Sequence, residues 1–213
     1  MKIMVLADEP APILWEYLDR RKLEGVELIL SCGDLPASYL SFLTCFTHAP
    51  ILYIHGNHDG SYEKTPPEGC ICIDGTVYVH NGIRIAGLGG CMRYNRGSFQ
   101  YTEGQMRRRL WRLLPRIAWH RGVDILVTHA PAFGLGDDKD LTHRGFKCFV
   151  SFMDRFHPHY LVHGHVHQSY GWNIPRIVEY QGIPIINAFE RYVLEVPDPA
   201  PAEPRKRRFL FGR

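Results

Sequence analysis

Histidines stand at alternate positions in the stretch His163-Gly164-His165-Val166-His167, which directly follows an apolar run. Imidazoles at this spacing, at the end of a strand-like segment, are natural ligands for one or two divalent metal ions. Such ions activate water and clamp phosphate groups. The chain also carries Gly-Asp, Gly-Asn-His-Asp and Thr-His, whose side chains suit the same ions. Together these short motifs predict metal chemistry, provided that the fold brings them to one place.

Each candidate residue falls where an expected strand passes into a loop. The candidates are Asp8, Asp34, Asn57, His58, His129, His165 and His167. Because the carboxyl ends of strands in α/β sheets converge on one crevice, ligands scattered along the sequence can meet in space. Carboxylates, an amide oxygen and imidazoles together suit Mn, Fe, Zn, Ni or Co. A carboxylate such as Asp34 can bridge two ions ~3.5–4 Å apart.

The segments that must position these residues alternate between short β-branched runs and helical patterns. Strands are expected at residues 2–7, 26–32, 51–55, 123–128, 160–162 and 192–196. Helices are expected from Pro12 to near Gly25, at 38–47 and at 146–156, with an arginine-rich amphipathic helix at 103–120 that is interrupted at Pro115. Asn81-Gly82 and Gln181-Gly182 predict the turns of two hairpins, 77–86 and 176–186. Parallel units followed by hairpins indicate two mixed sheets packed together, with helices outside.

A chain of 213 residues is long enough for one compact domain with a sizeable core, which we expect to span residues 1–196. Proline and then arginine dominate residues 197–213, which we expect to form a flexible tail. Five of the 25 basic residues lie in this tail, together with two of the 22 acidic residues, so 20 basic and 20 acidic residues remain in the body. The basic character thus belongs to the tail. No nucleic-acid motif accompanies it, so nucleic acid is not an expected partner.

The six cysteines form no Cys-x-x-Cys pair and lie mostly in apolar segments, which favours buried free thiols in a reducing cytoplasm. No apolar stretch approaches the ~18 residues of a membrane span, so no membrane contact is expected. The start of the chain, residues 1–6, is typical of a first strand rather than of a signal peptide. A cytoplasmic protein is the resulting expectation. The sequence leaves open whether it is a monomer or a homo-oligomer.

Taken in chain order, the motifs resemble those of the calcineurin-like metallophosphoesterase superfamily. They are Asp8, Gly33-Asp34, Gly56-Asn57-His58-Asp59, Thr128-His129 and Gly164-His165-Val166-His167. One such motif alone is weak, but five in the family's order over residues 8–167 are specific. The resemblance implies a four-layer αββα sandwich with a binuclear metal site, in which Mn²⁺ is the expected ion and Fe, Zn, Ni and Co remain open. It also implies a metal-dependent phosphoesterase.

The resemblance further implies a role for each motif residue. Asp8, Asp34 and His167 would hold the first metal. Asp34 as the bridge, Asn57, His129 and His165 would hold the second. His58 would not be a ligand but would contact the phosphate and act as general acid toward the leaving oxygen. A metal-activated hydroxide would attack phosphorus in line, because the ions lower its pKa toward neutrality.

One position departs from the family's pattern. The first motif of the family is Asp-x-His, whereas this chain reads Asp8-Glu9-Pro10. Proline has no side-chain ligand, so we expect a weakened first metal site. We do not expect Glu9 to take its place, because neighbouring residues on an extended segment point to opposite faces. Activity would then require high Mn²⁺, or occupancy would stop at one metal.

Substrate contacts are harder to assign from the sequence. Arg93, after the glycine-rich loop 87–90, is either a bidentate phosphate contact or an ordinary surface arginine. His143 lies in the charged loop 134–144, which is either a substrate lid or a solvated loop. The run of arginines between residues 107 and 116 is either a nucleic-acid patch or the solvent-facing side of a helix. His55 and His163 lie within strand-like segments, where we expect them to be packed or to orient a ligand.

Two functional hypotheses follow. The first is a phosphoesterase that hydrolyses a phosphodiester or a small phosphorylated or nucleotide substrate, with a broad phosphatase as its near neighbour. The small size of the chain and the lack of an added substrate domain favour a small-molecule diester. The second is a catalytically weak protein of the same fold that acts as an interaction scaffold, and Pro10 is the residue that supports it.

Overall fold

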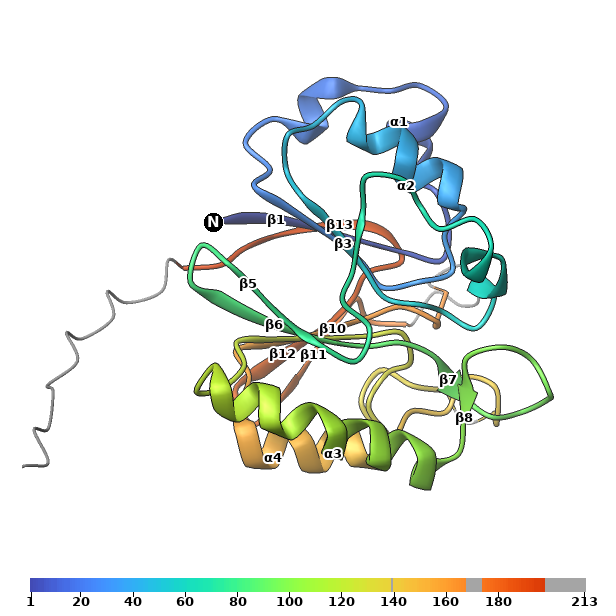
Figure 1. Cartoon of the computed structure of the whole chain (residues 1–213), viewed down its shortest axis with the longest axis vertical. Helices are drawn as coiled ribbons and strands as arrows, with labels where there is room; N and C mark the ends of the chain where they lie inside the picture. The colour runs from blue at the N-terminus through green and yellow to red at the C-terminus, as the bar shows by residue number, and fades with distance from the viewer. Residues whose placement is uncertain (139, 168–173, 198–213) are drawn as a thin grey trace, which may run out of the picture.

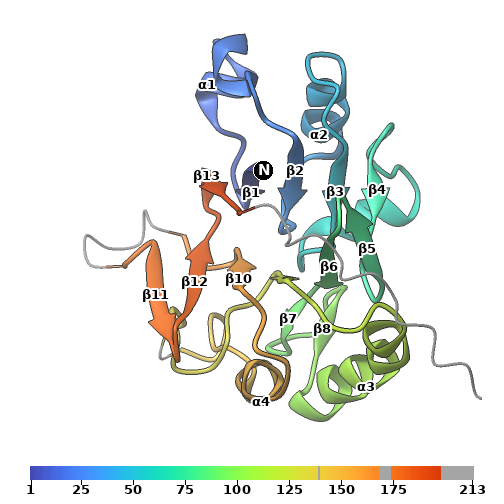
Figure 2. The ribbon, with the colours of Figure 1, turned by 90° about the vertical axis from the view of Figure 1, so that its left-hand side faces the viewer.

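The computed structural model of the protein describes residues 1–138, 140–167 and 174–197. Two sheets lie face to face, and helices cover the outer face of each (Figure 1; Figure 2). The prediction of a four-layer αββα sandwich of two mixed sheets is therefore confirmed. Apart from Pro197, the tail expected at 197–213 lies outside the described residues.

The first sheet has five strands in the order β13-β1-β2-β3-β4. They are β1 (Lys2–Ala7), β2 (Leu28–Ser31), β3 (Ile51–Tyr53), β4 (Ile71–Cys72) and β13 (Glu190–Glu195). Strands β1 to β4 run parallel, and β13 pairs antiparallel with β1. The carboxyl ends of β1, β2 and β3 therefore lie at one edge of the sheet, as the prediction of a shared crevice requires.

The second sheet has six strands in the order β11-β12-β10-β9-β6-β5. They are β5 (Val77–His80), β6 (Ile83–Leu88), β9 (Ile125–Thr128), β10 (Tyr160–His163), β11 (Ile177–Tyr180) and β12 (Ile183–Asn187). Both predicted hairpins form its antiparallel edges. Asn81 and Gly82 have φ of 47° and 85°, and Gln181 and Gly182 have φ of 51° and 80°, as a type I′ turn demands. A small third sheet pairs β7 (Cys91–Met92) with β8 (Gln100–Tyr101).

Strand β1 contributes side chains to two apolar layers of the core. Ile3 and Val5 pack between the two sheets, whereas Met4 and Leu6 pack under the helices on the outer face. This period of two is the geometry of a strand, and apolar residues on both faces mean that both are covered. A separate apolar cluster lies between the second sheet and its helices, with Phe149 among its members.

The helices are α1 (Pro12–Trp15), α2 (Ala37–Thr44), α3 (Glu103–Trp119) and α4 (Lys147–Phe156), with 3₁₀ turns η1 (Arg20–Leu23) and η2 (Asp59–Glu63). The single helix expected from Pro12 to near Gly25 is wrong. Leu18 has a φ of 34°, and Asp19 is extended with its carboxylate accepting from the N–H of Arg21. A residue in the left-handed region ends a helix, and Asp19 then caps a new one.

The expected interruption at Pro115 is also wrong, because α3 continues through it. Thr102 and Gln105 form a capping box that starts this helix. Proline removes one backbone hydrogen bond. Leu113 and Ile117, on either side of Pro115, are buried against the second sheet, and this packing holds both turns in place.

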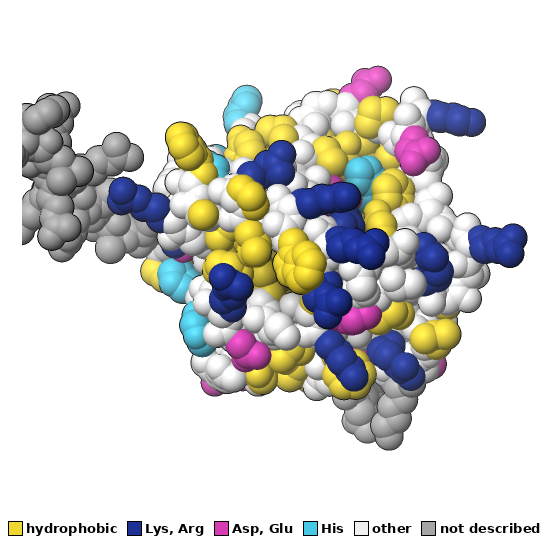
Figure 3. Space-filling model, turned by 60° about the horizontal axis from the view of Figure 1, so that its bottom comes forward, with side chains coloured by type: hydrophobic (Ala, Val, Ile, Leu, Met, Phe, Trp, Pro, Cys, Tyr) yellow, Lys and Arg dark blue, Asp and Glu magenta, His cyan; other side chains and the backbone are white. Residues whose placement is uncertain are grey.

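The arginine run of α3 lies on a face where basic side chains alternate with apolar ones (Figure 3). Arg107, Arg108, Arg112 and Arg116 are exposed, which agrees with the solvent-facing side of a helix. Arg109 differs, since its side chain is 17% exposed and pairs with Asp74. In the described part of the chain, no helix has the length and apolar character needed to cross a membrane.

All six cysteines are free, but the expectation that they are buried holds only in part. Cys32, Cys91 and Cys148 are buried, whereas Cys45 and Cys72 are exposed. The exposed Cys72 belongs to β4, a two-residue strand at the end of the first sheet that the sequence pattern did not indicate.

The carboxylate of Asp74 joins three layers of the fold. It accepts from the guanidinium of Arg109 on α3 and from the N–H of Gly89 after β6, at 2.8 Å. Its other oxygen lies 3.2 Å from Nδ1 of His55, after β3. Burial by itself would raise the pKa of Asp74, but the hydrogen bond to His55 and the charge of Arg109 hold that pKa below its usual value. Asp74 thus links both sheets and a helix through one ionised group.

We expect Asp74→Ala to lower the free energy of unfolding by about 3–5 kcal/mol, because it leaves the cation of Arg109 buried without its partner. The folded-state pKa of Asp74 is depressed, so its contribution is present above the unfolded pKa near 4 and is lost as the pH falls below it. Urea unfolding at pH 7 and pH 3 measures both effects. Glu68→Ala, at an exposed carboxylate, is the control and should change stability little. Equal effects of the two substitutions would contradict the assignment.

Candidate metal centre

Every predicted ligand lies just beyond the carboxyl end of a strand. Asp8 follows β1, Asp34 follows β2 and Asn57 follows β3, all in the first sheet. His129 follows β9, and His165 and His167 follow β10, in the second sheet. The site therefore lies where the ends of the two sheets meet.

Three of these residues have a positive φ, which is uncommon for residues other than glycine. The values are 66° for Asp8, 58° for Asp34 and 69° for His165. Such backbone conformations cost free energy and persist only where surrounding contacts enforce them. Their concentration at the ends of β1, β2 and β10 supports this end of the sandwich as the candidate site.

The centre of the site is a group of three residues. Ligand atoms of Asp34, His129 and His165 all lie within 4.8 Å of one another. Nε2 of His129 is 3.2 Å from Oδ2 of Asp34 and 3.0 Å from Oδ1 of Asn57. A carboxylate, an amide oxygen and two imidazoles in this arrangement fit a divalent transition-metal ion. These are the four residues that the resemblance assigns to the second metal.

His129 is oriented for this purpose by the backbone. Its Nδ1 lies 2.8 Å from the carbonyl oxygen of Cys32, which accepts the Nδ1–H. The other ring nitrogen, Nε2, is thereby left toward Asp34 and Asn57. A hydrogen bond of this kind fixes the tautomer and the plane of a ligating imidazole.

The electrostatics of the group favour a cation. Burial would raise the pKa of Asp34, but the neighbouring His129 lowers it to about 2. Burial would likewise lower the pKa of His129, but Asp34 and Asp8 raise it to about 9. A proton on His129 therefore balances the carboxylates in the protein alone. A divalent ion held by these residues would take over that role, since ligation requires the imidazole to be neutral.

Asp8 and His167, the other two residues that the resemblance assigns to a metal, lie in different surroundings. Burial raises the pKa of Asp8 to about 7, and both of its oxygens accept from the backbone N–H of His165, at 2.8 and 3.0 Å. Burial and the charge of His129 lower the pKa of His165 to about 3. His167 is less buried, and its Nδ1 lies 3.4 Å from Oε1 of Glu9. Asp8 and His167 thus border the three-residue group without belonging to it.

Asp59, the last residue of Gly-Asn-His-Asp, supports the site from behind. Its Oδ2 accepts from the backbone N–H of Asp34 at 2.8 Å and of Gly56 at 2.7 Å. The N–H of His58 in turn donates to Oδ1 of Asp34 at 2.7 Å. These bonds hold the loops after β2 and β3 against each other. Asp59 is the positioning residue of its motif, a role that its place beside Asn57 and His58 did not reveal.

The glycines of these motifs are needed because the two loops touch. A Cβ on Gly56 would lie 2.1 Å from Oδ1 of Asp34, and one on Gly33 would lie 2.3 Å from the backbone nitrogen of Gly56. Gly33 also has a φ of 95°. No side chain fits in either place, so one close contact between the two loops requires the glycine of Gly-Asp and the glycine of Gly-Asn-His-Asp.

The ligand residues border a cavity of 470 Å³. It is lined by Asp8, Asp34, Asn57, His58, Tyr94, Thr142, His143, His165 and His167. His58 is exposed to this cavity. Tyr94 was not predicted to contact the site, yet its hydroxyl oxygen lies 3.2 Å from Nδ2 of Asn57. Its only signal in the sequence was its position beside Arg93.

Arg93 and His143, the predicted substrate contacts, differ in placement. Arg93 donates to the carbonyl of Gln100 and to Oε1 of Gln105, at 3.3 and 3.1 Å, and is not among the residues that line the cavity. The ring of His143 lies 5.3 Å from that of His165. Nδ1 of His143 is held by the carboxylate of Asp140 at 2.9 Å.

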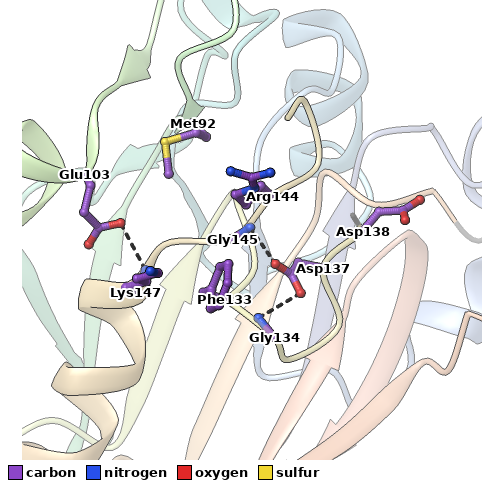
Figure 4. A pocket seen from close by; sticks show the side chains of 9 residues that line it. All are labelled: Met92, Glu103, Phe133, Gly134, Asp137, Asp138, Arg144, Gly145 and Lys147. Carbon is purple, nitrogen blue, oxygen red and sulfur yellow. Dashed lines mark hydrogen bonds between the residues drawn. The ribbon is translucent and has the colours of Figure 1, made fainter. Parts of the chain in front are cut away.

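The loop that carries His143 also contributes residues to a larger cavity of 740 Å³ (Figure 4). Asp137 accepts from the N–H groups of Gly134 and Gly145, at 2.8 and 3.0 Å, and so closes the loop on itself. Arg144 and Lys147 line the larger cavity, whereas Thr142 and His143 line the cavity beside the predicted metal ligands. The loop therefore contributes residues to the lining of both cavities.

His163 and His55 lie near the site without lining its cavity. His163 is fully buried at the end of β10, where burial lowers its pKa to about 4. Its Nδ1 is 2.9 Å from the carbonyl oxygen of Gly164. His55 stacks on Phe99 with ring centroids 4.3 Å apart and contacts Asp74. Both are packed residues, as one of the two interpretations expected.

Comparisons with known proteins agree with this geometry. The family described as calcineurin-like phosphoesterase matches residues 1–169. A UPF0046 protein of Caenorhabditis elegans is 30% identical over 121 residues, which cover 55% of this chain and 29% of that protein. Human "Metallophosphoesterase domain-containing protein 1" is 30% identical over 105 residues, which cover 48% of this chain and 31% of that protein. The chain thus matches less than a third of the length of these relatives.

A solved structure supports the fold. The crystal structure of TT1561 from Thermus thermophilus superposes with a TM-score of 0.62 at 15% sequence identity and covers 89% of both chains. At this identity the likeness concerns the fold alone. The family resemblance read from the motifs is confirmed by the family match over residues 1–169.

We expect Gly56→Ala to weaken Mn²⁺ binding and to lower the free energy of unfolding by about 1–3 kcal/mol, because its Cβ displaces the carboxylate of Asp34. Isothermal titration with Mn²⁺ and urea unfolding measure the two effects. Gly104→Ala is the matched control, since a Cβ there meets nothing within 4 Å. Gly104 lies in α3, where alanine is favoured, so this control should bind Mn²⁺ normally and be no less stable. Unchanged binding by Gly56→Ala would contradict the close-contact argument.

Proposed function

The chain belongs to the calcineurin-like phosphoesterase family, and on that premise we propose that it hydrolyses a phosphodiester of a small molecule, such as a nucleotide. The observation that carries the proposal is the convergence of Asp34, His129 and His165 within 4.8 Å, beside a cavity that Asp34 and His165 line. Divalent metal ions are the family's cofactors, and this donor set fits them. We propose a binuclear site in which Mn²⁺ is the working ion.

In the proposed site each ion is held by residues from both sheets. Asp34, Asn57, His129 and His165 hold one ion, and Asp8, Asp34 and His167 hold the other. Bound ions supply a Lewis acid that lowers the pKa of water and neutralises phosphate charge. Asp34 is the residue shared by both ions, and Asp59 keeps its backbone in place through the N–H that it accepts.

His58 is proposed as the general acid. Its backbone N–H donates to Oδ1 of Asp34, which holds the backbone of His58 beside the proposed ligands. Its side chain is exposed in the cavity and therefore accessible to a leaving oxygen. Proton transfer from a positioned histidine is worth about 10²–10⁴ in rate.

Charge supports a diester over a monoester. None of the described residues that line the cavity is a lysine or arginine. A phosphodiester carries one negative charge at neutral pH, whereas a monoester approaches two. The lining consists of imidazoles, hydroxyls, an amide and two carboxylates, so the singly charged group is the better match. The cavity of 470 Å³ suits a small-molecule ester.

The alternative is a catalytically weak protein of this fold that serves as an interaction scaffold. Pro10 supports it, because the family's imidazole is missing at that position. The two functions differ in one measurable property, since only an enzyme turns over an ester in a manner that depends on its own ligands.

We expect the purified protein to hydrolyse bis(p-nitrophenyl) phosphate with Mn²⁺, to lose this activity in EDTA and to act more slowly on p-nitrophenyl phosphate. Asp34→Ala should abolish turnover, because both ions lose a ligand. His58→Ala should lower kcat about a hundredfold or more while Mn²⁺ binding persists. His48→Ala, at an exposed histidine outside the motifs, is the control. Binding of Mn²⁺ without turnover of any ester would favour the scaffold.

We also expect His143→Ala to lower kcat/KM for the diester about tenfold, mainly through KM, because His143 lines the cavity and is held by Asp140. Asp140→Asn should have a smaller effect in the same direction. Arg93→Ala should leave both constants nearly unchanged, since its guanidinium is engaged with Gln100 and Gln105. A larger loss for Arg93→Ala than for His143→Ala would reverse this assignment.

A further inference from the structure

The side chain of Glu9 lies beside the metal site, contrary to the expectation from the sequence. Its Oε1 is 3.4 Å from Nδ1 of His167, one of the proposed ligands of the first metal. Among the described residues, the Glu9 carboxylate makes no other ion pair or hydrogen bond. Pro10, next in the chain, occupies the position at which the family has an imidazole.

The backbone explains why the expectation was wrong. It assumed an extended segment, in which neighbouring side chains point to opposite faces. The chain instead turns at Asp8, where φ is 66° and the N–H of Glu9 donates to the carbonyl of Ala7 at 2.7 Å. This is a three-residue γ-turn, a strained conformation. It directs two successive carboxylates toward the segment after β10.

The two carboxylates contact different residues of that segment. Asp8 accepts from the backbone N–H of His165, and Glu9 approaches the ring of His167. The ring of His167 is also packed on Phe189, with centroids 5.0 Å apart, which limits its rotation. The Glu9 side chain is 51% exposed and that of His167 is 24% exposed. A contact so open to solvent contributes little to stability, so folding alone does not account for it.

We propose that Glu9 replaces the missing imidazole, so that Asp8, Glu9, Asp34 and His167 hold the first metal. This inference rests on the proposed binuclear function. It gives the two sites different chemistry. The first has three carboxylates and one imidazole, and the second has two imidazoles, an amide and the shared carboxylate. Oxygen-rich sets suit Mn²⁺ and Mg²⁺, whereas imidazoles suit Zn²⁺, so the first site should prefer Mn²⁺ over Zn²⁺ more strongly than the second.

The test is metal binding by the full chain after removal of metals, measured by titration calorimetry with Mn²⁺ and by electron paramagnetic resonance. The wild type should bind one Mn²⁺ tightly and a second more weakly, with the signal of a coupled pair. Glu9→Gln should weaken the second event about 10–100-fold, remove the coupled signal and leave the tight site unchanged. Glu16→Gln, an exposed neighbour on the same part of the chain, is the matched control.

Glutamine separates a ligand from a positioning residue. Its Oε1 still accepts a hydrogen bond from His167, so a role limited to orienting that ring would leave Mn²⁺ binding as in the wild type and would overturn the proposal. The double substitution Glu9→Gln with Pro10→His should restore the weaker site and shift its preference from Mn²⁺ toward Zn²⁺. If the double variant has the wild-type free energy of unfolding but does not regain the weaker metal site, the proposal is also overturned.

The outcomes distinguish a failure of this inference from a failure of the proposed phosphoesterase function. Two-site binding that is indifferent to Glu9→Gln but lost in Asp34→Ala overturns the role of Glu9 and leaves the binuclear phosphoesterase intact. A wild-type protein that binds no Mn²⁺ at all overturns both.

Discussion

The approach of Asp34 to His129 is the constraint on which the rest of the site depends. Asp34 follows a strand of the first sheet and His129 a strand of the second, so their contact at 3.2 Å requires the two sheets to pack in one arrangement. Ile85 and Val127, in the apolar layer between the sheets, help to set it. Burying a carboxylate and an imidazole costs solvation free energy, which packing elsewhere must offset. The metal centre is thus a property of the whole sandwich.

Backbone groups at the sheet ends make this concentration of polar side chains tolerable. Cys32 accepts from His129, and His58 and His165 donate to Asp34 and Asp8. Each bond satisfies a buried polar atom and also fixes a ligand in place. Gly33 and Gly56 permit the loops to approach closely enough for these bonds to form. The same contacts therefore serve stability and preorganisation of the site.

The two halves of the site differ in how far they are assembled. Asp34, His129 and His165 lie within one ion's reach, whereas Asp8 and His167 border that group. Pro10 removes an imidazole, and the turn at Asp8 brings Glu9 beside His167. On the proposed assignment the chain keeps two sites but exchanges a nitrogen ligand for an oxygen. Such an exchange changes which metal is preferred without changing the fold that holds it.

The sequence by itself determined the architecture and indicated the candidate residues of the site. Short apolar runs predicted the strands, Asn81-Gly82 predicted a hairpin turn, and motifs at strand ends indicated the candidate ligands. These features are local, so a single chain segment contains their signal. Only the tertiary structure decided that Tyr94 rather than Arg93 lines the cavity and that α3 passes through Pro115. It also decided that Glu9 turns toward His167. These outcomes depend on contacts between segments that are distant in sequence. Such contacts override local conformational preference, and they produce no periodic pattern in the sequence.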